Sequence, residues 1–104
     1  MRKMKVCNFG ISLEKKELIT LSVNLPKNSE ILSVKTDNGD HVMWLYYMAP
    51  SEECLKQDHE LWCEFEFIIV DCKYEDIEID EHKFINIICI EDTDYAVFCK
   101  KITK

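Results

Sequence analysis

Residues 30–49 read EILSVKTDNGDHVMWLYYMA, and this stretch decides the fold. Two runs rich in β-branched and aromatic residues flank Asn38-Gly39, a dipeptide that readily takes the two positive φ angles of a type I′ hairpin turn. The sequence therefore predicts a β-hairpin here. A register centred on the dipeptide gives two pairs on a buried face and two on the opposite face: Leu32 with Leu45 and Val34 with Met43, then Ile31 with Tyr46 and Ser33 with Trp44.

The rest of the chain repeats this pattern of short apolar runs separated by polar turns. Further strands are predicted over residues 4–11, 18–25, 60–72, 83–91 and 95–102, with a turn at 12–17 and a loop at 50–59. The last two strands form a second hairpin around residues 92–94. Residues 74–81 alternate acidic and apolar side chains, which suits either a short edge strand with an acidic outer face or an irregular connector.

These patterns predict an all-β protein, because no stretch of a dozen residues has a helical apolar period. The 104 residues form one domain, residues 1–104, folded as a small antiparallel sandwich or a partly open barrel of about seven strands. Hydrophobic residues make up 47% of the chain and charged residues 32%, which is typical of a folded, soluble domain.

Compartment and cysteine chemistry follow from the same composition. No apolar run reaches the length of a membrane span, and the first residues lack the apolar core of a secretory signal, so we expect a cytoplasmic protein with no membrane partner. The six cysteines are scattered through apolar runs and are predicted to be reduced core thiols: Cys7, Cys54, Cys63, Cys72, Cys89 and Cys99.

The charge distribution excludes one class of partner and favours another. The net charge is −7 and the chain has a single arginine, so direct binding of nucleic acid is not expected. Between Thr36 and His82 there are two lysines against fourteen carboxylates. Such a field favours a basic protein partner, although dispersed carboxylates also serve simply to keep a small protein soluble.

No catalytic, cofactor or metal motif is present. The two glycines, Gly10 and Gly39, are too few for a phosphate-binding loop, and no cysteine pair has the close spacing of a zinc site. The sequence therefore predicts no enzyme activity, no cofactor and no metal. The acidic row Asp76, Glu78 and Asp80 lacks the spacing of a calcium loop and is interpreted as a solvated acidic face.

Residues 25–50, LPKNSEILSVKTDNGDHVMWLYYMAP, resemble an uncharacterised family of short bacteriophage-encoded β-rich proteins. The matching features are a proline-lysine turn, the ILSV strand, the short polar turn and the tryptophan-containing strand, and the resemblance covers mainly residues 4–50. It implies a β fold and a phage origin. No catalytic residue is carried over with it.

Partner contact is predicted on the non-core face of the central hairpin, which carries Ile31, Val42, Trp44 and Tyr46. The predicted partner-binding residues are Trp44, Tyr46, Asp37, Asp40 and Trp62, because amphipathic rings are common in interface hot spots. The competing interpretation is that these rings belong to a two-sided core.

The functional hypothesis is a non-enzymatic phage accessory protein. It would bind and inhibit a host protein, in host takeover or anti-defence, with a nucleic-acid-handling protein as the expected target. The alternative is a protein that sequesters a small nucleotide-type ligand, with Lys35 and His41 beside Trp44 and Tyr46. A homo-oligomer is a third possibility.

Overall fold

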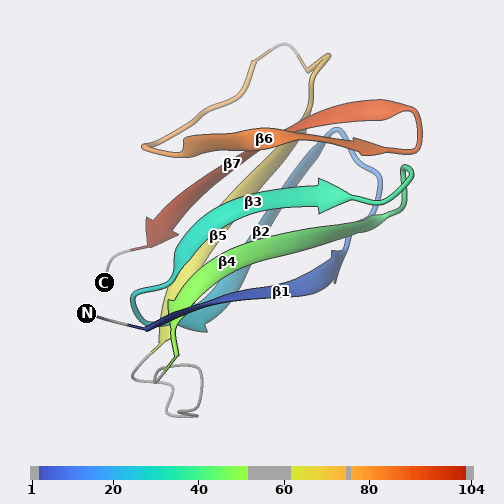
Figure 1. The fold of residues 1–104 in the computed structure, drawn as a ribbon. Coiled ribbons are helices and arrows are strands. Elements are labelled where there is room, and N and C mark those ends of the chain that lie inside the picture. The colour runs from blue at the N-terminus through green and yellow to red at the C-terminus, as the bar shows by residue number, and fades with distance from the viewer. Residues whose placement is uncertain (1–2, 52–61, 75, 103–104) are drawn as a thin grey trace.

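Seven β-strands form two antiparallel sheets in the computed structural model, which describes residues 3–51, 62–74 and 76–102 (Figure 1). The strands are β1 (Met4–Ser12), β2 (Leu18–Pro26), β3 (Glu30–Thr36), β4 (Val42–Pro50), β5 (Trp62–Asp71), β6 (Lys83–Ile90) and β7 (Thr93–Ile102). One sheet has the order β1-β4-β3 and the other β2-β5-β7-β6. The predicted all-β fold is confirmed, and no described segment forms a helix long and apolar enough to cross a membrane.

The two sheets meet along the edges of β3 and β6, where side chains take the place of a backbone ladder. Asn86 Oδ1 accepts a hydrogen bond from the Val34 N–H (3.2 Å), and Asn86 Nδ2 donates one to the Val34 carbonyl (2.7 Å). Further along, the Thr36 hydroxyl donates to the Cys89 carbonyl (2.6 Å). The sheets are thereby fastened together without closing into a barrel.

The central hairpin forms, but its register differs from the predicted one by two residues. Asn38 and Gly39 take φ angles of 50° and 74°, as a type I′ turn requires. One residue precedes this pair and three follow it before the first rung of the β3–β4 ladder, so Val34 faces Leu45 and not Met43. A shift of two residues keeps each side chain on its face, and Val34 and Leu45 remain buried.

A β-bulge at Leu32 corrects a second part of the hairpin prediction. The ladder shifts between Ile31 and Ser33, so Leu32 has no direct partner on β4 and its side chain is 46% exposed. Because the extra residue inverts the alternation before it, Ile31 packs against the core. The predicted burial of Leu32, the outward orientation of Ile31 and the pairing of Ser33 with Trp44 are therefore wrong.

The core lies between the sheets and receives alternate residues from the strands of both. The largest fully buried side chains are Leu25, Val34, Met43, Leu45, Phe67, Ile69, Ile90, Tyr95 and Val97. On β5, the alternate residues Phe65, Phe67 and Ile69 face this core. Each Å² of apolar surface that is removed from water stabilises the fold by roughly 25 cal/mol, so this core is the main stabilising contribution.

The segment after β5 is an irregular connector and not an edge strand in its described residues, 72–74 and 76–82. It returns along the top of the molecule in Figure 1. The His82 side chain, only 4% exposed, bonds through Nε2 to Glu66 Oε1 (2.9 Å) on the outer face of β5. Ile68 and Val70 on that same face are also buried. The connector therefore covers part of the outer face of the four-stranded sheet.

The second hairpin, β6–β7, has a tighter turn than predicted. Ile90 pairs with Thr93, which leaves Glu91 and Asp92 as the turn residues, and Glu91 takes a φ of 54°. The prediction that Thr93 and Asp94 belong to the turn is wrong, since both residues pair within the ladder. A two-residue turn fixes the hairpin register tightly.

The described cysteines are free thiols, as predicted, but only some of them lie in the core. Cys99 is buried, whereas Cys72 is exposed. Burial raises the pKa of the Cys99 thiol to about 12, so this thiol is neutral at physiological pH. Cys54 and most of the predicted loop at 50–59 lie outside the described residues.

Candidate functional site

The outer face of the β1-β4-β3 sheet carries large apolar side chains that no described segment covers. Trp44 and Tyr46 lie on this face, opposite the buried side of β4, and Trp44 is 37% exposed. On β1, Val6 pairs with Met48, and Val6 is 63% exposed. We call Val6, Trp44, Tyr46 and Met48 the aromatic face.

Both rings of the aromatic face are held in place by their neighbours. Gly10 lies directly opposite Trp44, and a Cβ on Gly10 would lie 3.3 Å from two carbons of the indole and 2.9 Å from Val42 Cγ1. The glycine therefore leaves room for the indole to lie across β1. The Lys35 ammonium lies 5.1 Å from the centroid of the Tyr46 ring, a cation–π contact worth about 0.5–1 kcal/mol at an exposed site.

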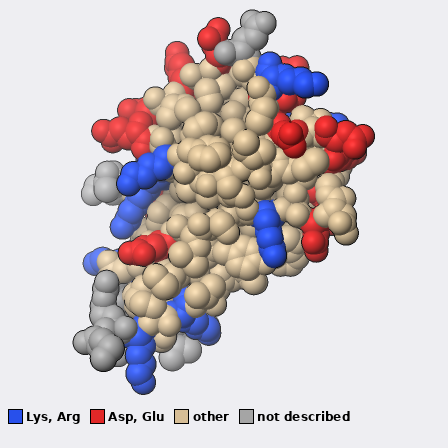
Figure 2. Space-filling view, turned by 45° about the horizontal axis from the view of Figure 1, so that its top comes forward, with Lys and Arg blue, Asp and Glu red and all other residues tan. Residues whose placement is uncertain are grey.

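The turns at one end of the sandwich are joined by hydrogen bonds and form an acidic surface beside the aromatic face. The Leu13 N–H donates to the His41 carbonyl (2.8 Å), and the Asp71 N–H donates to the Glu17 carbonyl (2.8 Å). Three lysines also lie in these turns. We call the nine described carboxylates there the acidic end: Glu14, Glu17, Asp37, Asp40, Asp71, Asp76, Glu91, Asp92 and Asp94. Figure 2 shows acidic side chains at the top, the upper left and the right-hand edge, and most basic side chains at the left and lower left.

Glu91 connects three of these turns. Its carboxylate lies 2.9 Å from Lys15 Nζ and 3.0 Å from His41 Nε2, and its N–H donates to the Gly39 carbonyl (2.7 Å). The hydrogen bond from Lys15, followed by that from His41, holds the pKa of Glu91 below its usual value. Glu91 is thus neutralised by its partners, whereas no described ammonium group lies within ion-pair distance of Asp37, which adjoins the aromatic face.

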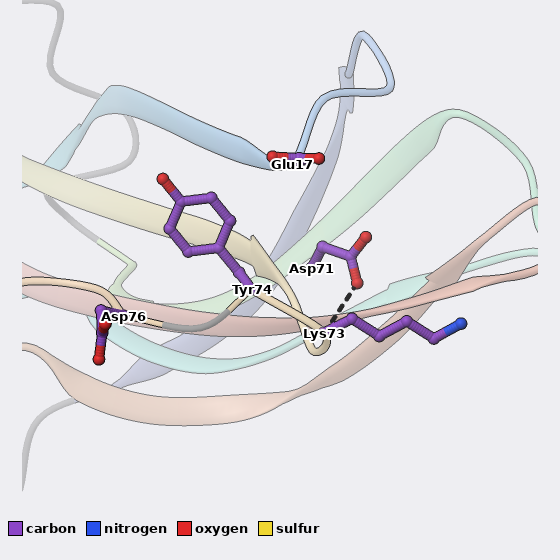
Figure 3. Close-up of a pocket in the computed structure, with 5 residues that line it drawn as sticks. All are labelled: Glu17, Asp71, Lys73, Tyr74 and Asp76. Carbon is purple, nitrogen blue, oxygen red and sulfur yellow. Dashed lines mark hydrogen bonds between the residues drawn. The ribbon is translucent and has the colours of Figure 1, made fainter.

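A pocket of about 440 Å³ opens at the acidic end, where β2 begins, β5 ends and the connector departs (Figure 3). It is lined by Glu17, Asp71, Lys73, Tyr74 and Asp76. The Asp71 carboxylate accepts a hydrogen bond from the Lys73 N–H (2.9 Å), and Figure 3 shows the Lys73 side chain extending away from Tyr74 and Asp76. Carboxylates around a phenol ring suit a cationic group, such as a lysine or arginine side chain of a partner.

Trp62 does not join the other predicted partner-binding residues. It begins β5 opposite Pro26, in the other sheet, and its side chain is 39% exposed. Asp37 and Asp40 flank the turn of the same hairpin that carries Trp44 and Tyr46 on β4. The structure therefore separates the predicted set into a hairpin group and a distant Trp62.

The predicted acidic face on the connector is not a regular row. Asp76, Glu78 and Asp80 are exposed, but the segment is not a strand that would align them. Asp80 pairs with Lys100 (3.2 Å), and Asp76 lines the pocket of the acidic end. Within the described ranges, no group of three or more His, Cys, Asp or Glu side chains is placed to hold a metal ion.

Sequence reasoning missed a second exposed apolar surface on the neighbouring strands β3 and β6. Phe84 and Ile87 are each 55% exposed, and Leu32 projects outward at its bulge. We call Leu32, Phe84 and Ile87 the β6 patch. Its signal was the sequence KFINIICI, where apolar residues occupy both alternating positions, as in a strand with apolar contacts on both faces. Figure 2 shows a broad uncharged area on the side of the molecule that carries β6.

The predicted nucleotide-type site on the hairpin is not assembled. Lys35 lies over the Tyr46 ring, whereas His41 turns to Glu91 at the acidic end. The Lys35 ammonium and the His41 ring are therefore directed to different partners.

A comparison with protein-family models, curated proteins and solved structures finds no match to this chain. The functional argument consequently depends on its exposed surfaces and their charges.

Proposed function

We propose that this chain is a non-enzymatic, phage-type accessory protein that acts in the host cytoplasm by binding and inhibiting a host protein. The observation that carries the proposal is the aromatic face beside the acidic end. An exposed tryptophan is fixed there next to carboxylates that have no described ammonium partner. The resemblance of residues 4–50 to short phage proteins supplies the phage context.

The charge of the surface favours a basic partner. The acidic end holds three times as many carboxylates as lysines, and two of those lysines, Lys15 and Lys16, are already paired with glutamates. A partner with a basic surface is steered to such a region, and its binding weakens as salt rises. Host proteins that bind nucleic acid carry basic surfaces, so they are the favoured targets.

The aromatic face provides the apolar contact that charge alone lacks. Tryptophan and tyrosine are enriched among residues that dominate binding energy, and a ring that is already positioned loses little entropy on binding. Trp44 is positioned by Gly10, and Tyr46 by Lys35. The β6 patch lies on the adjoining strands and would enlarge the buried area toward the size of a specific interface.

The test compares matched variants in affinity capture from a bacterial host lysate. The tagged wild-type chain, Trp44→Ser and Leu18→Ser are used as baits, and the captured proteins are quantified by mass spectrometry at low and high salt. Leu18 is the control because it is an exposed large apolar residue on β2, in the other sheet. Any captured protein is then purified and assayed for its own activity with and without the chain.

The expected result is a basic host protein that wild type and Leu18→Ser capture at low salt and Trp44→Ser loses. Its activity should fall when the wild-type chain is added. The proposal fails if no protein is captured, or if all three baits capture the same proteins equally. It also fails if size-exclusion chromatography shows a homo-oligomer that dissociates in the Trp44→Ser variant, because the aromatic face would then bind a second copy of the chain.

A further inference from the structure

A second pocket, of about 320 Å³, opens between the two sheets where β3 and β6 begin, at the end opposite the acidic turns. Its lining residues are Ser29, Glu30, Ile31, Phe65, Glu81, Lys83, Ile85, Cys99, Lys100 and Lys101. This size lies at the lower end of the range of small-molecule sites. The pocket shares no residue with the aromatic face or the acidic end.

The floor of this pocket is apolar. Phe65 and Cys99 are buried core residues, and Ile31 and Ile85 pack against the same core. Burial raises the pKa of the Cys99 thiol to about 12, so the floor carries no charge at neutral pH. An apolar side chain entering here would replace water over a surface that continues the core.

The rim of the pocket carries both signs of charge, in groups that do not neutralise one another. Lys83 and Lys101 form no ion pair with any described residue, and the same is true of Glu30 and Glu81. Lys100, by contrast, is paired with Asp80 (3.2 Å). Two ammonium groups and two carboxylates therefore border an apolar floor without contacting each other.

Hydrogen bonds hold the part of the rim that lies between the connector and β6. His82 Nδ1 accepts a hydrogen bond from the Asp80 N–H (3.2 Å), which places the ring proton on Nε2 beside Glu66 (2.9 Å). His82 lies between Glu81 and Lys83 in the chain, and its buried ring fixes the backbone from which both side chains extend. The backbone positions of these two charged residues are therefore fixed before any ligand arrives.

We propose that this pocket binds a free apolar α-amino acid, a function beyond the one proposed above. The apolar side chain would enter the floor, the carboxylate would meet Lys83 or Lys101, and the ammonium would meet Glu30 or Glu81. A ligand with both charges complements this rim. A simple anion would be repelled by the two rim carboxylates, and a simple cation by the two rim ammonium groups. The chemistry is reversible binding with no covalent step.

The experiment is an NMR titration of the full chain with labelled isoleucine methyl groups. The probes are L-phenylalanine, 3-phenylpropanoate, which lacks the ammonium, and phenethylamine, which lacks the carboxylate. Saturable shifts are expected at Ile31 and Ile85, and not at Ile19 near the start of β2. L-phenylalanine should bind about tenfold more tightly than either analogue, a difference of one ion-pair contact in each case.

Charge-removing variants separate the two contacts. The double variant Lys83→Gln/Lys101→Gln should weaken the binding of L-phenylalanine and 3-phenylpropanoate without weakening that of phenethylamine. The double variant Glu30→Gln/Glu81→Gln should weaken the binding of L-phenylalanine and phenethylamine without weakening that of 3-phenylpropanoate. Lys27→Gln is the control, because Lys27 is exposed and does not line the pocket. The proposal is overturned if no probe shifts the Ile31 and Ile85 methyl groups, or if either analogue binds as tightly as L-phenylalanine. It is also overturned if the Gln variants affect all three probes equally.

Discussion

Replacing Asn86 with alanine tests the side-chain link between the two sheets. Asn86 makes two hydrogen bonds to the backbone of Val34, at 3.2 Å and 2.7 Å, across the edge where β3 and β6 share no ladder. Val34 pairs with Leu45 on its other side, and its own N–H and carbonyl point toward Asn86. Alanine would leave both backbone groups without their partner in a partly buried position.

The expected loss follows from these two hydrogen bonds. Each contributes about 1 kcal/mol net, and a backbone group left unsatisfied away from water costs about 1–3 kcal/mol. Because this edge is only partly buried, water will satisfy some of the freed groups, so we expect Asn86→Ala to lower the free energy of unfolding by about 2–4 kcal/mol. That is a large share of the 5–15 kcal/mol typical of a domain.

Urea unfolding followed by circular dichroism measures this loss. The matched control is Asn24→Ala, an exposed asparagine on β2, which should change stability by less than about 0.5 kcal/mol. Asn86→Asp adds a sharper test, because its carboxylate oxygen would face the Val34 carbonyl where the amide now donates. This variant should be destabilised at pH 7 and should recover relative to Asn86→Ala as the pH falls toward about 4, where the acid gains a proton to donate. Equal stabilities of Asn86→Ala and Asn24→Ala would refute the reasoning.

Three further predictions concern other contacts. Gly10→Ala should lower the free energy of unfolding by about 1 kcal/mol, because its methyl group would press on Val42 Cγ1 (2.9 Å) and on the Trp44 ring (3.3 Å), and urea unfolding at wild-type stability would contradict this. Glu91→Gln should destabilise the chain at pH 7, where Lys15 holds the carboxylate. The difference should vanish as the pH falls through the lowered pKa of Glu91, and a pH-independent difference would disprove the pairing. Tyr95→Phe should resist alkaline unfolding better than wild type. Burial raises the pKa of Tyr95, so the unfolded wild-type chain ionises first above pH 10, and an unchanged alkaline midpoint would refute this.

The fold was predictable because its determinants are local. Asn38-Gly39 specifies its turn through positive φ angles, and runs of β-branched and aromatic residues specify the strands on either side of the turn. The hairpin register was not predictable in the same way. It includes three residues after the turn and a bulge at Leu32, on a strand whose other edge meets β6 through Asn86. Those contacts join segments about fifty residues apart, and no local pattern records them.

The candidate surfaces were likewise predictable where they depend on local patterns and not where they depend on distant contacts. The outward position of Trp44 follows from alternation, since Met43 and Leu45 on either side of it are buried. The acidic end was visible in the sequence only as an excess of carboxylates, because its turns are brought together by contacts such as Lys15 with Glu91. The pocket beside Lys101 had no sequence signal, since its residues come from four separate segments.

The pairing of Gly10 with Trp44 separates a functional surface from a merely stable one. An acidic turn has a structural explanation, because aspartate and asparagine favour turns for their own backbone hydrogen bonds. A glycine inside a strand has no such explanation, since it costs roughly 0.5–1 kcal/mol relative to alanine. The large ring that needs this glycine remains 37% exposed, so the core gains little from the arrangement. Stability alone would favour a larger residue at position 10 and a smaller one at position 44. The indole lying across β1 therefore supports the proposal that Trp44 contacts a partner protein.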